Sequence, residues 1–441
     1  MRDTEARAPA EAADATGVAD THPAASGARW SRRRRVRFTA TAALVTLLVA
    51  ITGYTVVIAI TPLPPLAATV AADALQPVTA DDAAARAVPA GHALPTAIGW
   101  LESEAVWANG DEPVQMASLT KLVTALVCLD AYPLQPRTDG PTFTWTAEDR
   151  AVQEFYQRLD GITYPTPVGT EMTMRQMLQL ALLPSANDFA AALVTRVFGS
   201  DEAFLAAAAE WIAAHGLTSM TIVEPTGLND GNRASPGDLV RLARLALANE
   251  SVRELVAQPA ATLPWGPGRV ENTNPLLGTV PGVVGLKTGS LTTVGYNLIV
   301  ARTADAHGRP VTEIAVVLAR PSREARAQAG VEVLAAMSMV PQAVPLLTEG
   351  VPLGEVVTWQ GDRVPVVAGG SAATVLLPAD TAVRRVAVAN VGAASAGEVV
   401  GEWIATAPTG VVRVPVVLAD DITEPDLWWR LTHPAAVFGW R

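Results

Sequence analysis

A serine and a lysine stand three positions apart in the stretch from Met116 to Leu126. The apolar residues of this stretch recur at helical spacing, so one helical turn places Ser118 and Lys121 on the same face. A serine hydroxyl is a poor nucleophile until a neighbouring base takes its proton. A lysine amine acts as that base when burial or a nearby cation lowers its pKa. The spacing therefore predicts a serine nucleophile with a lysine base.

The use of lysine in the rest of the chain supports this interpretation. The sequence has thirty arginines but only two lysines, Lys121 and Lys287. Arginine does not lose its proton in proteins, and its planar guanidinium replaces a compact proton carrier poorly. We therefore expect both lysines to occupy positions that need an amine.

Two further polar motifs follow along the chain, in the order Ser185-Ala186-Asn187 and Lys287-Thr288-Gly289-Ser290. The first comes directly after Pro184, which ends an expected helix, so its two polar side chains converge only if the motif forms a turn. The second continues an expected strand at 283–286. Each motif alone is common, but their order and spacing after Ser118 and Lys121 raise the specificity of the pattern.

The elements that must position these residues indicate an α/β (α+β) domain over residues 94–340. Helices are expected at 116–126, 147–159, 173–183, 188–198, 201–215, 235–248 and 324–337, and strands at 97–101, 104–107, 283–286, 296–302 and 312–318. Short apolar runs with turn residues between them then predict a small all-β domain at 341–424. An aromatic tail follows at 425–441. Two alternatives remain for the surface on which it packs, a membrane interface and its own domain.

The N-terminal part of the chain predicts a membrane anchor. Residues 1–35 have the composition of a disordered tail, here expected in the cytoplasm, and 36–60 form an expected transmembrane helix of about 34 Å over its uncharged part. Arginines before this helix predict a catalytic domain outside the cell membrane. A cleaved signal peptide is the alternative for the helix. The Ala- and Pro-rich residues 61–93 are expected to form an extended tether.

Composition argues against several functional classes. The formal net charge is −11, and no basic patch follows the N-terminus, so nucleic-acid binding is not expected. The single cysteine, Cys128, excludes an intrachain disulfide and is expected in the core. The five histidines are scattered without metal-ligand spacing, so we expect neither a metal nor another cofactor.

From about Ala97 to Met337 the chain resembles the D-alanyl-D-alanine carboxypeptidases, which are low-molecular-mass penicillin-binding proteins related to β-lactamases. The matching segments are Met116-Ala117-Ser118-Leu119-Thr120-Lys121, Ser185-Ala186-Asn187-Asp188, Pro225-Thr226-Gly227-Leu228, Ser235-Pro236-Gly237-Asp238-Leu239, Asn272-Thr273-Asn274 and Gly285-Leu286-Lys287-Thr288-Gly289. The resemblance implies a β-lactamase/transpeptidase-like fold, in which helices and a helical cluster flank an antiparallel sheet. One departure is Ala186, where the family more often has glycine, and a methyl group there costs little unless the backbone needs a positive φ.

The resemblance also implies roles for the residues of the motifs. Ser118 would attack the carbonyl between two D-alanines of a peptidoglycan stem peptide, with Lys121 as base and Ser185 as proton relay to the leaving amine. β-Lactam antibiotics would acylate the same serine. The substrate would be bound by Asn187, Lys287, Thr288, Gly289, Ser290 and an arginine, for which Arg326 is favoured over Arg323. Lys287 would keep positive potential in the cleft and help to hold Lys121 neutral, and the backbone N–H groups of Ser118 and Ser290 would form the oxyanion hole.

Several other functions compete with this one. A serine hydrolase of the triad type would need a histidine partner and a Gly-x-Ser-x-Gly motif, which the sequence lacks. A β-lactamase shares the acylation chemistry, but the sequence has no Glu-x-x-x-Asn-type loop that resembles its water-activating element. An endopeptidase on cross-linked wall peptides and a catalytically dead wall-binding protein are the remaining alternatives.

Overall fold

The computed structural model of the 441-residue chain describes residues 32–266 and 268–440. Contacts divide the chain into two units. One contains the N-terminal helix and the segment from Glu424 onward, and the other extends from Pro65 to Thr423. The tail expected over residues 1–35 lies outside the described residues as far as position 31, and the helix has already begun at Arg32.

The larger unit contains a five-stranded antiparallel sheet in the order β11-β12-β13-β3-β4. Its strands are β3 (Thr96–Trp100), β4 (Val106–Ala108), β11 (Val283–Leu291), β12 (Gly295–Ala306) and β13 (Arg309–Arg320). Ala97 of β3 pairs with Val316 of β13, so the beginning and the end of this domain meet within the sheet. β11, which carries Lys287, is an edge strand of this sheet, and it contacts the short helix that contains Ser118.

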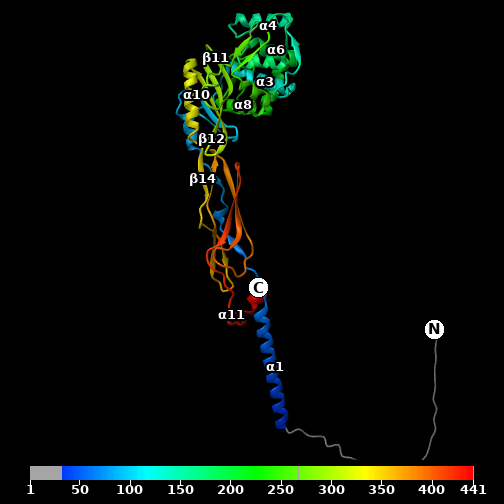
Figure 1. Ribbon diagram of the computed structural model, residues 1–441, viewed down its shortest axis with the longest axis vertical. Helices are drawn as coiled ribbons and strands as arrows, with labels where there is room; N and C mark the ends of the chain where they lie inside the picture. Colours follow the sequence, from blue (N-terminus) through cyan, green and yellow to red (C-terminus); the bar gives the residue numbers. More distant parts are fainter. Residues whose placement is uncertain (1–31, 267, 441) are drawn as a thin grey trace, which may run out of the picture. The chain divides into compact units, whose positions relative to one another are not determined.

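Helices cover both faces of this sheet (Figure 1). α10 (Arg323–Met337) and α2 (Ala83–Ala90) pack on one face, and α8 (Pro236–Ala248) packs on the other. Because side chains alternate along a strand, Ile98 contributes to the core beneath α10 whereas its neighbour Ala97 contributes to the core beneath α8.

A cluster of helices adjoins α8 and surrounds α3. Its members are α3 (Thr120–Ala131), α4 (Ala147–Arg158), α5 (Met174–Leu182), α6 (Asn187–Phe198), α7 (Asp201–Ala214) and α9 (Glu250–Val256). The sequence predicts α3 as an amphipathic helix, but every residue from Thr120 to Leu129 is buried. The reason is that α3 crosses the cluster between other helices, so its polar face is enclosed as well and supplies side chains to the site.

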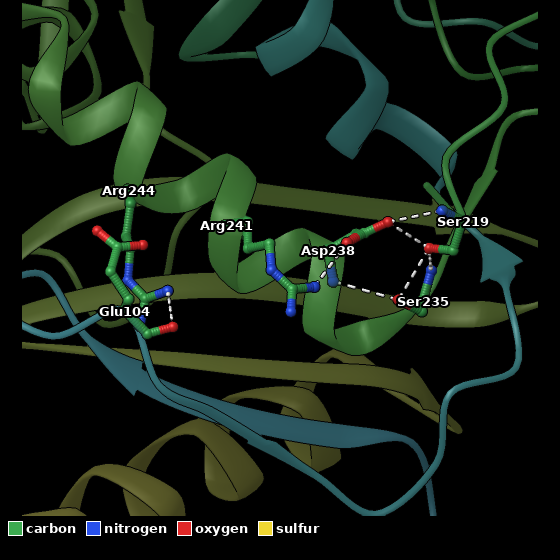
Figure 2. A network of polar contacts seen from close by, with 6 residues as sticks. All are labelled: Glu104, Ser219, Ser235, Asp238, Arg241 and Arg244. Atoms are coloured by element: carbon green, nitrogen blue, oxygen red, sulfur yellow. Dashed lines mark hydrogen bonds and ion pairs between the residues drawn. The ribbon is translucent and has the colours of Figure 1, made fainter. Parts of the chain in front are cut away.

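A polar network fixes α8 against the sheet (Figure 2). Ser235 caps the helix by accepting from the backbone N–H of Asp238, and the Asp238 carboxylate accepts from the backbone N–H and hydroxyl of Ser219. Further along α8, the buried guanidinium of Arg244 donates to three backbone carbonyls between positions 100 and 105. The motif at 235–239 is therefore a helix start, as its sequence predicts.

The region after α10 consists of strands, as predicted. β14 (Gln342–Leu347) pairs with β17 (Ala372–Leu376), and a seven-stranded antiparallel sheet has the order β1-β15-β16-β20-β19-β18-β2. Five of its strands lie in this region, at β15 (Pro352–Val357), β16 (Arg363–Ala368), β18 (Thr381–Val388), β19 (Val399–Ala407) and β20 (Gly410–Leu418). Its core is a separate hydrophobic cluster that contains the buried Trp403.

The segment at 61–93, expected as an extended tether, instead forms part of the folded unit from Pro65 onward. β1 (Ala68–Val70) and β2 (Val78–Thr79) are the two outer strands of the seven-stranded sheet, joined by a short 3-10 helix (Ala72–Leu75), and α2 follows. The physical reason is that small apolar residues such as Ala74 reach the core of the β region. Prolines are tolerated next to edge strands, so their presence does not indicate an unfolded segment.

Short ribbons complete the larger unit. They are formed by the pairs β5 (Val114–Gln115) with β8 (Arg233–Ala234), β6 (Thr142–Thr144) with β7 (Glu171–Thr173), and β9 (Ala260–Thr262) with β10 (Arg269–Glu271). The first ribbon immediately precedes the Ser118 segment and fixes where that segment begins.

The smaller unit contains α1 (Arg32–Ile60), α11 (Leu427–Thr432) and α12 (Pro434–Phe438). From Arg35 to Ile60, α1 is long and apolar enough to cross a membrane, judged by length and composition. The C-terminal end of α1 contacts the C-terminal segment, because Tyr54 donates to the carbonyl of Leu431 (3.1 Å) and Arg430 donates to that of Thr61 (3.0 Å). The aromatic tail thus forms two short helices that pack beside α1.

Candidate active site

Ser118 lies in a short 3-10 helix, Ala117–Leu119, that leads directly into α3. Ala117 has a φ of 49°, a left-handed conformation that costs a residue with a Cβ about 1–2 kcal/mol. Such strain is common at functional sites. Asn297 of β12 supports the turn by donating to the carbonyl of Gln115 (2.9 Å) and accepting from Ala319 (2.9 Å). Hydrogen bonds therefore fix the backbone that leads to Ser118, which is not a free loop.

Lys121 is buried and makes three polar contacts through Nζ. Nζ lies 3.0 Å from Ser118 Oγ, 3.1 Å from Asn187 Oδ1 and 2.7 Å from the carbonyl oxygen of Thr226. The two carbonyl oxygens only accept, so a neutral amine donates both of its protons to them and turns its lone pair to the serine hydroxyl. An ammonium is satisfied by the same three groups, so the contacts serve both protonation states.

Burial lowers the pKa of Lys121 to about 7, while the charges of Glu224 and Asp188 oppose this shift. Burial disfavours the ammonium because the charged form loses its hydration. A base with a pKa near neutrality is able to take a proton and to return it at physiological pH. The environment of Lys121 thus suits the role predicted for it.

The turn between α5 and α6 brings Ser185 and Asn187 to the same side. Ser185 has a φ of 73°, whereas Ala186 has an ordinary φ of −62°. The left-handed residue of this turn is therefore the serine, and alanine in place of the more usual glycine introduces no strain at 186. Asn187 starts α6, which directs its side chain to Lys121.

Lys287 reaches the site from the edge strand β11. Its Nζ donates to Ser185 Oγ (2.9 Å) and to the carbonyl of Thr288 (3.0 Å). Burial, followed by the charges of Lys121 and Arg326, lowers the pKa of Lys287 well below its ordinary value. A like charge nearby disfavours a second ammonium, so a proton on Lys121 makes a proton on Lys287 less favourable. That Lys287 is the lysine that keeps the charge stays a prediction.

The strand after Lys287 passes close to the serine. A Cβ on Gly289 would lie 3.0 Å from the backbone nitrogen of Ser118, so only glycine lets β11 approach this closely. Thr288 is buried and donates to Thr273 Oγ1 (2.6 Å), and Ser290 is exposed on the same strand. The oxyanion role of the Ser290 and Ser118 N–H groups stays a prediction, since it concerns a substrate-bound state.

Arg326 projects from α10 and is buried beside the ring of Tyr296, with its guanidinium carbon 5.8 Å from the ring centre. Its Nε has no hydrogen-bond partner, and burial lowers its pKa to about 10. A buried guanidinium with an unused donor near Lys287 is suited to a carboxylate ligand. Arg326, the arginine favoured from the sequence, is therefore buried beside the site, and its role in binding a carboxylate stays a prediction.

Sequence reasoning assigned no role to some residues that the structure brings to the site. Thr226 was part of a matching segment, but its carbonyl contact with Lys121 has no sequence signal. Thr124 donates to the neighbouring carbonyl of Pro225 (2.6 Å), and its place three residues after Lys121 was the available signal. Within the described residues, no group of three or more His, Cys, Asp or Glu side chains is arranged to hold a metal ion.

The fold and the site fit one class of enzyme, the serine hydrolases, and the contact between Lys121 Nζ and Ser118 Oγ is the one that a lysine base would need. Residues 104–322 match the family model of D-alanyl-D-alanine carboxypeptidase. The carboxypeptidase DacB2 of Mycobacterium tuberculosis is 32% identical over 209 residues, which cover 46% of this chain and 67% of that protein. DacF of Bacillus subtilis is 29% identical over 225 residues, which cover 50% of this chain and 55% of that protein.

An enzyme named D-alanyl-D-alanine endopeptidase from Pseudomonas aeruginosa is 30% identical over 200 residues, covering 44% of this chain and 61% of its own length. Among solved structures, penicillin binding protein 5 from Haemophilus influenzae has a TM-score of 0.51 at 18% identity and covers 75% of this chain and 97% of its own. The Streptomyces K15 DD-transpeptidase has a TM-score of 0.50 at 25% identity and covers 55% and 95%.

This chain belongs to the D-alanyl-D-alanine carboxypeptidase family of serine peptidases. The fold class predicted from the sequence is confirmed by the structural neighbours, and the family by the matching family model and relatives. The chain spans between about half and two thirds of the length of the curated relatives described here.

Proposed function

We propose that this protein removes the terminal D-alanine from peptidoglycan stem pentapeptides through an acyl-enzyme on Ser118. The main support for the proposal is the position of Lys121 Nζ, 3.0 Å from Ser118 Oγ and 3.1 Å from Asn187 Oδ1, together with the contact of Lys287 Nζ with Ser185 Oγ (2.9 Å). Each group needed for acyl transfer between a peptide and a serine is present: a nucleophile, a base, a proton relay and a cation for the terminal carboxylate.

The reaction has two steps. In the first, the Ser118 hydroxyl gives its proton to the Lys121 amine, and Oγ forms a bond to the carbonyl carbon between the two D-alanines. The carbon–nitrogen bond then breaks while Ser185 relays the proton from Lys121 to the leaving amine, so that free D-alanine departs. In the second step a water molecule attacks the ester carbon, the bond from this carbon to Oγ breaks, and the shortened peptide leaves while a proton of the water returns to Ser118. Arg326 and Thr288 bind the terminal carboxylate of the substrate.

The direct test uses the full-length chain in detergent. A peptide ending in D-Ala-D-Ala should release D-alanine, and fluorescent penicillin should label the protein covalently. Ser118→Ala should abolish both, because the nucleophile is gone. Ser103→Ala, a change in the turn between β3 and β4, is the matched control and should leave both unchanged. Persistent labelling of Ser118→Ala would remove the nucleophile assignment.

An endopeptidase that cuts cross-linked wall peptides is the second candidate, because relatives in Pseudomonas aeruginosa and Escherichia coli carry that name. A cross-linked peptide dimer and a linear pentapeptide, offered at equal concentration, separate the two. Faster turnover of the pentapeptide supports the carboxypeptidase. Faster turnover of the dimer supports the endopeptidase, and rapid hydrolysis of the penicillin adduct would indicate a β-lactamase.

The site of action follows from the N-terminal helix. We propose that α1 anchors the protein in the cell membrane as a single span, with the N-terminus in the cytoplasm and the catalytic domain outside. The length and apolar composition of α1, together with the arginines on its N-terminal side, support this topology. Peptidoglycan lies outside the membrane, so this arrangement gives the site access to its substrate.

A further inference from the structure

One carboxylate beside the site organises the loop that contacts Lys121. Glu224 stands directly before the loop Pro225-Thr226-Gly227. Its Oε2 accepts from the backbone N–H of Thr226 (2.8 Å) and from the Thr226 hydroxyl (2.7 Å). Its Oε1 accepts from the backbone N–H groups of Gly227 and Asn229 and from the side-chain amide of Asn232. Five donors thus converge on one side chain.

The loop held in this way faces α3 with its carbonyl groups. The Thr226 carbonyl accepts from Lys121 Nζ (2.7 Å), and the Pro225 carbonyl accepts from the Thr124 hydroxyl (2.6 Å). Lys121 and Thr124 lie one turn apart on the helix, so the loop is bound along a single face. Glu224 is therefore connected to Lys121 by two sets of hydrogen bonds, one between Glu224 and the loop and one between the loop and Lys121.

The loop has no freedom to move closer to the serine. Gly227 has a φ of +88°, and a Cβ on it would lie 2.0 Å from the carbonyl oxygen of Ala117. The backbone of the loop is therefore in contact with the segment that carries Ser118. Because packing fixes the loop on that side, the hydrogen bonds to Glu224 decide where the Thr226 carbonyl points.

Charged and titratable groups approach the two lysines from several elements. Lys287 comes from β11, Asp188 from α6 and Arg326 from α10, while Tyr156 of α4 and Asp201 of α7 lie near Glu224. Of these groups, Glu224 and Asp188 favour the ammonium form of Lys121, and Glu224 is the stronger. The Asp188 oxygens accept from the side-chain amide of Gln153 and from the backbone N–H groups of Tyr164 and Phe189.

We propose that Glu224 is a positioning residue for the catalytic base: its carboxylate fixes the Thr226 carbonyl against the Lys121 amine and places a negative charge beside it. This inference rests on the proposed function in taking Lys121 as the base. The negative charge opposes burial and keeps the amine able to hold a proton during the reaction. The fixed carbonyl keeps the amine aimed at Ser118.

The test exploits the fact that the chain has only two lysines. Full-length protein labelled with ¹³C-lysine and held in detergent shows two ε-carbon resonances, and Lys121→Arg removes one and so assigns them. Glu224→Gln removes the negative charge. It also replaces one carboxylate oxygen with an NH2 group, which does not accept a hydrogen bond from the N–H of Thr226. The titration midpoint of Lys121 should therefore fall by at least about half a pH unit, because a negative charge near an ammonium stabilises it.

The acylation rate gives the second measurement. At pH 9, where Lys121 is neutral in both proteins, fluorescent penicillin should label Glu224→Gln at least about tenfold more slowly, a part of the 10²–10⁴ that a positioned base contributes. Glu210→Gln, an exposed charge loss on α7, is the control and should match the wild type in both measurements. An unchanged Lys121 midpoint in folded Glu224→Gln would overturn the proposal and leave Glu224 a structural residue.

A milder variant covers the case in which Glu224→Gln does not fold. Thr226→Val removes the hydroxyl that donates to Oε2 and leaves the backbone and the carboxylate in place. Acylation should fall about threefold or more at pH 9, and a wild-type rate would overturn the proposal. Failure of the proposed function would appear differently, as an absence of labelling in the wild type, and the lysine titration is readable even then.

Discussion

At the scale of single residues, the site depends on burying two amines that most proteins leave in water. Lys121 and Lys287 are each about 1% exposed, and burial is the largest cause of the lowered pKa of both. Moving an ammonium out of water is costly unless it is paired or gives up its proton. The two buried amines lie at the two positions that the sequence predicts to need an amine.

Lys121→Arg tests whether the amine is needed as a base. Arginine keeps the positive charge and is able to donate to Asn187 and Thr226, but it does not deprotonate. We expect penicillin acylation of Ser118 to fall by about 10²–10⁴, the usual contribution of a general base, as measured by gel fluorescence over time. Arg241→Lys, on the half-exposed side of α8, is the control and should acylate normally. A Lys121→Arg enzyme that acylates at the wild-type rate would show that the lysine is structural.

How much of the site could be predicted from the sequence depends on where each signal lies. The contact between Ser118 and Lys121 could be predicted because residues three positions apart lie on the same face of a helix. Ser185, Asn187 and Lys287 were found by the order of their motifs, and the structure brings all of these residues together. Contacts made through backbone carbonyls, such as that of Thr226, leave no trace in residue type and could not be predicted.

At the scale of elements, the close contact between the loop at 225–227 and the Ser118 segment sets the geometry of the site. Both pieces of chain depend on unusual backbone, with positive φ at Ala117 and at Gly227. The Thr226 carbonyl of the loop contacts Lys121, and the segment contains Ser118, the predicted nucleophile. Crowding between the loop and the Ser118 segment should therefore lower the rate of acylation as well as the free energy of unfolding.

Gly227→Ala should separate crowding from backbone strain. A Cβ there would lie 2.0 Å from the Ala117 carbonyl oxygen, so the loop must shift, and we expect a loss of about 3 kcal/mol or more in the free energy of unfolding, with acylation reduced at least about tenfold. Gly199→Ala also has a positive φ, +81°, but nothing within 4 Å. It should cost about 1–2 kcal/mol and acylate normally. Equal effects of the two changes in urea unfolding and in labelling would contradict this picture.

Whether a helix or strand could be predicted from the sequence depended on the hydrophobic periodicity of its residues. Helices with strong hydrophobic periodicity were correctly placed, for example α5, which ends just before Pro184, and α8. The segment at 61–93 was assigned as a tether because its prolines and alanines have no period. In the structure it adds edge strands to a sheet whose other strands lie about 300 residues away in the sequence, as the pairing of Thr69 with Glu355 shows. A strand partner at such a distance cannot be predicted from the local sequence.

At the scale of the whole molecule, the membrane helix should decide where the enzyme works. Full-length protein should stay with carbonate-washed membranes, because a predominantly apolar helix of 26 residues, Arg35–Ile60, is long enough to span the bilayer and is not extracted by alkali. A chain that begins at Pro62 should be released into the supernatant and still bind fluorescent penicillin. In intact spheroplasts, a penicillin that does not cross the membrane should label the full-length protein. Labelling only after permeabilisation would contradict an external catalytic domain.

We propose that a neutral Lys121 activates Ser118, and the pH dependence of acylation reports the protonation state of this amine. Rapid quenching followed by intact-protein mass spectrometry gives the rate at which penicillin adds to Ser118 between pH 5 and pH 9. Since burial lowers the pKa of Lys121 to about 7 and the unprotonated amine is the active form, the rate should rise about tenfold per pH unit below pH 7 and level off above it. A rate that does not change across this range, or one that rises only near pH 10, would contradict the claim.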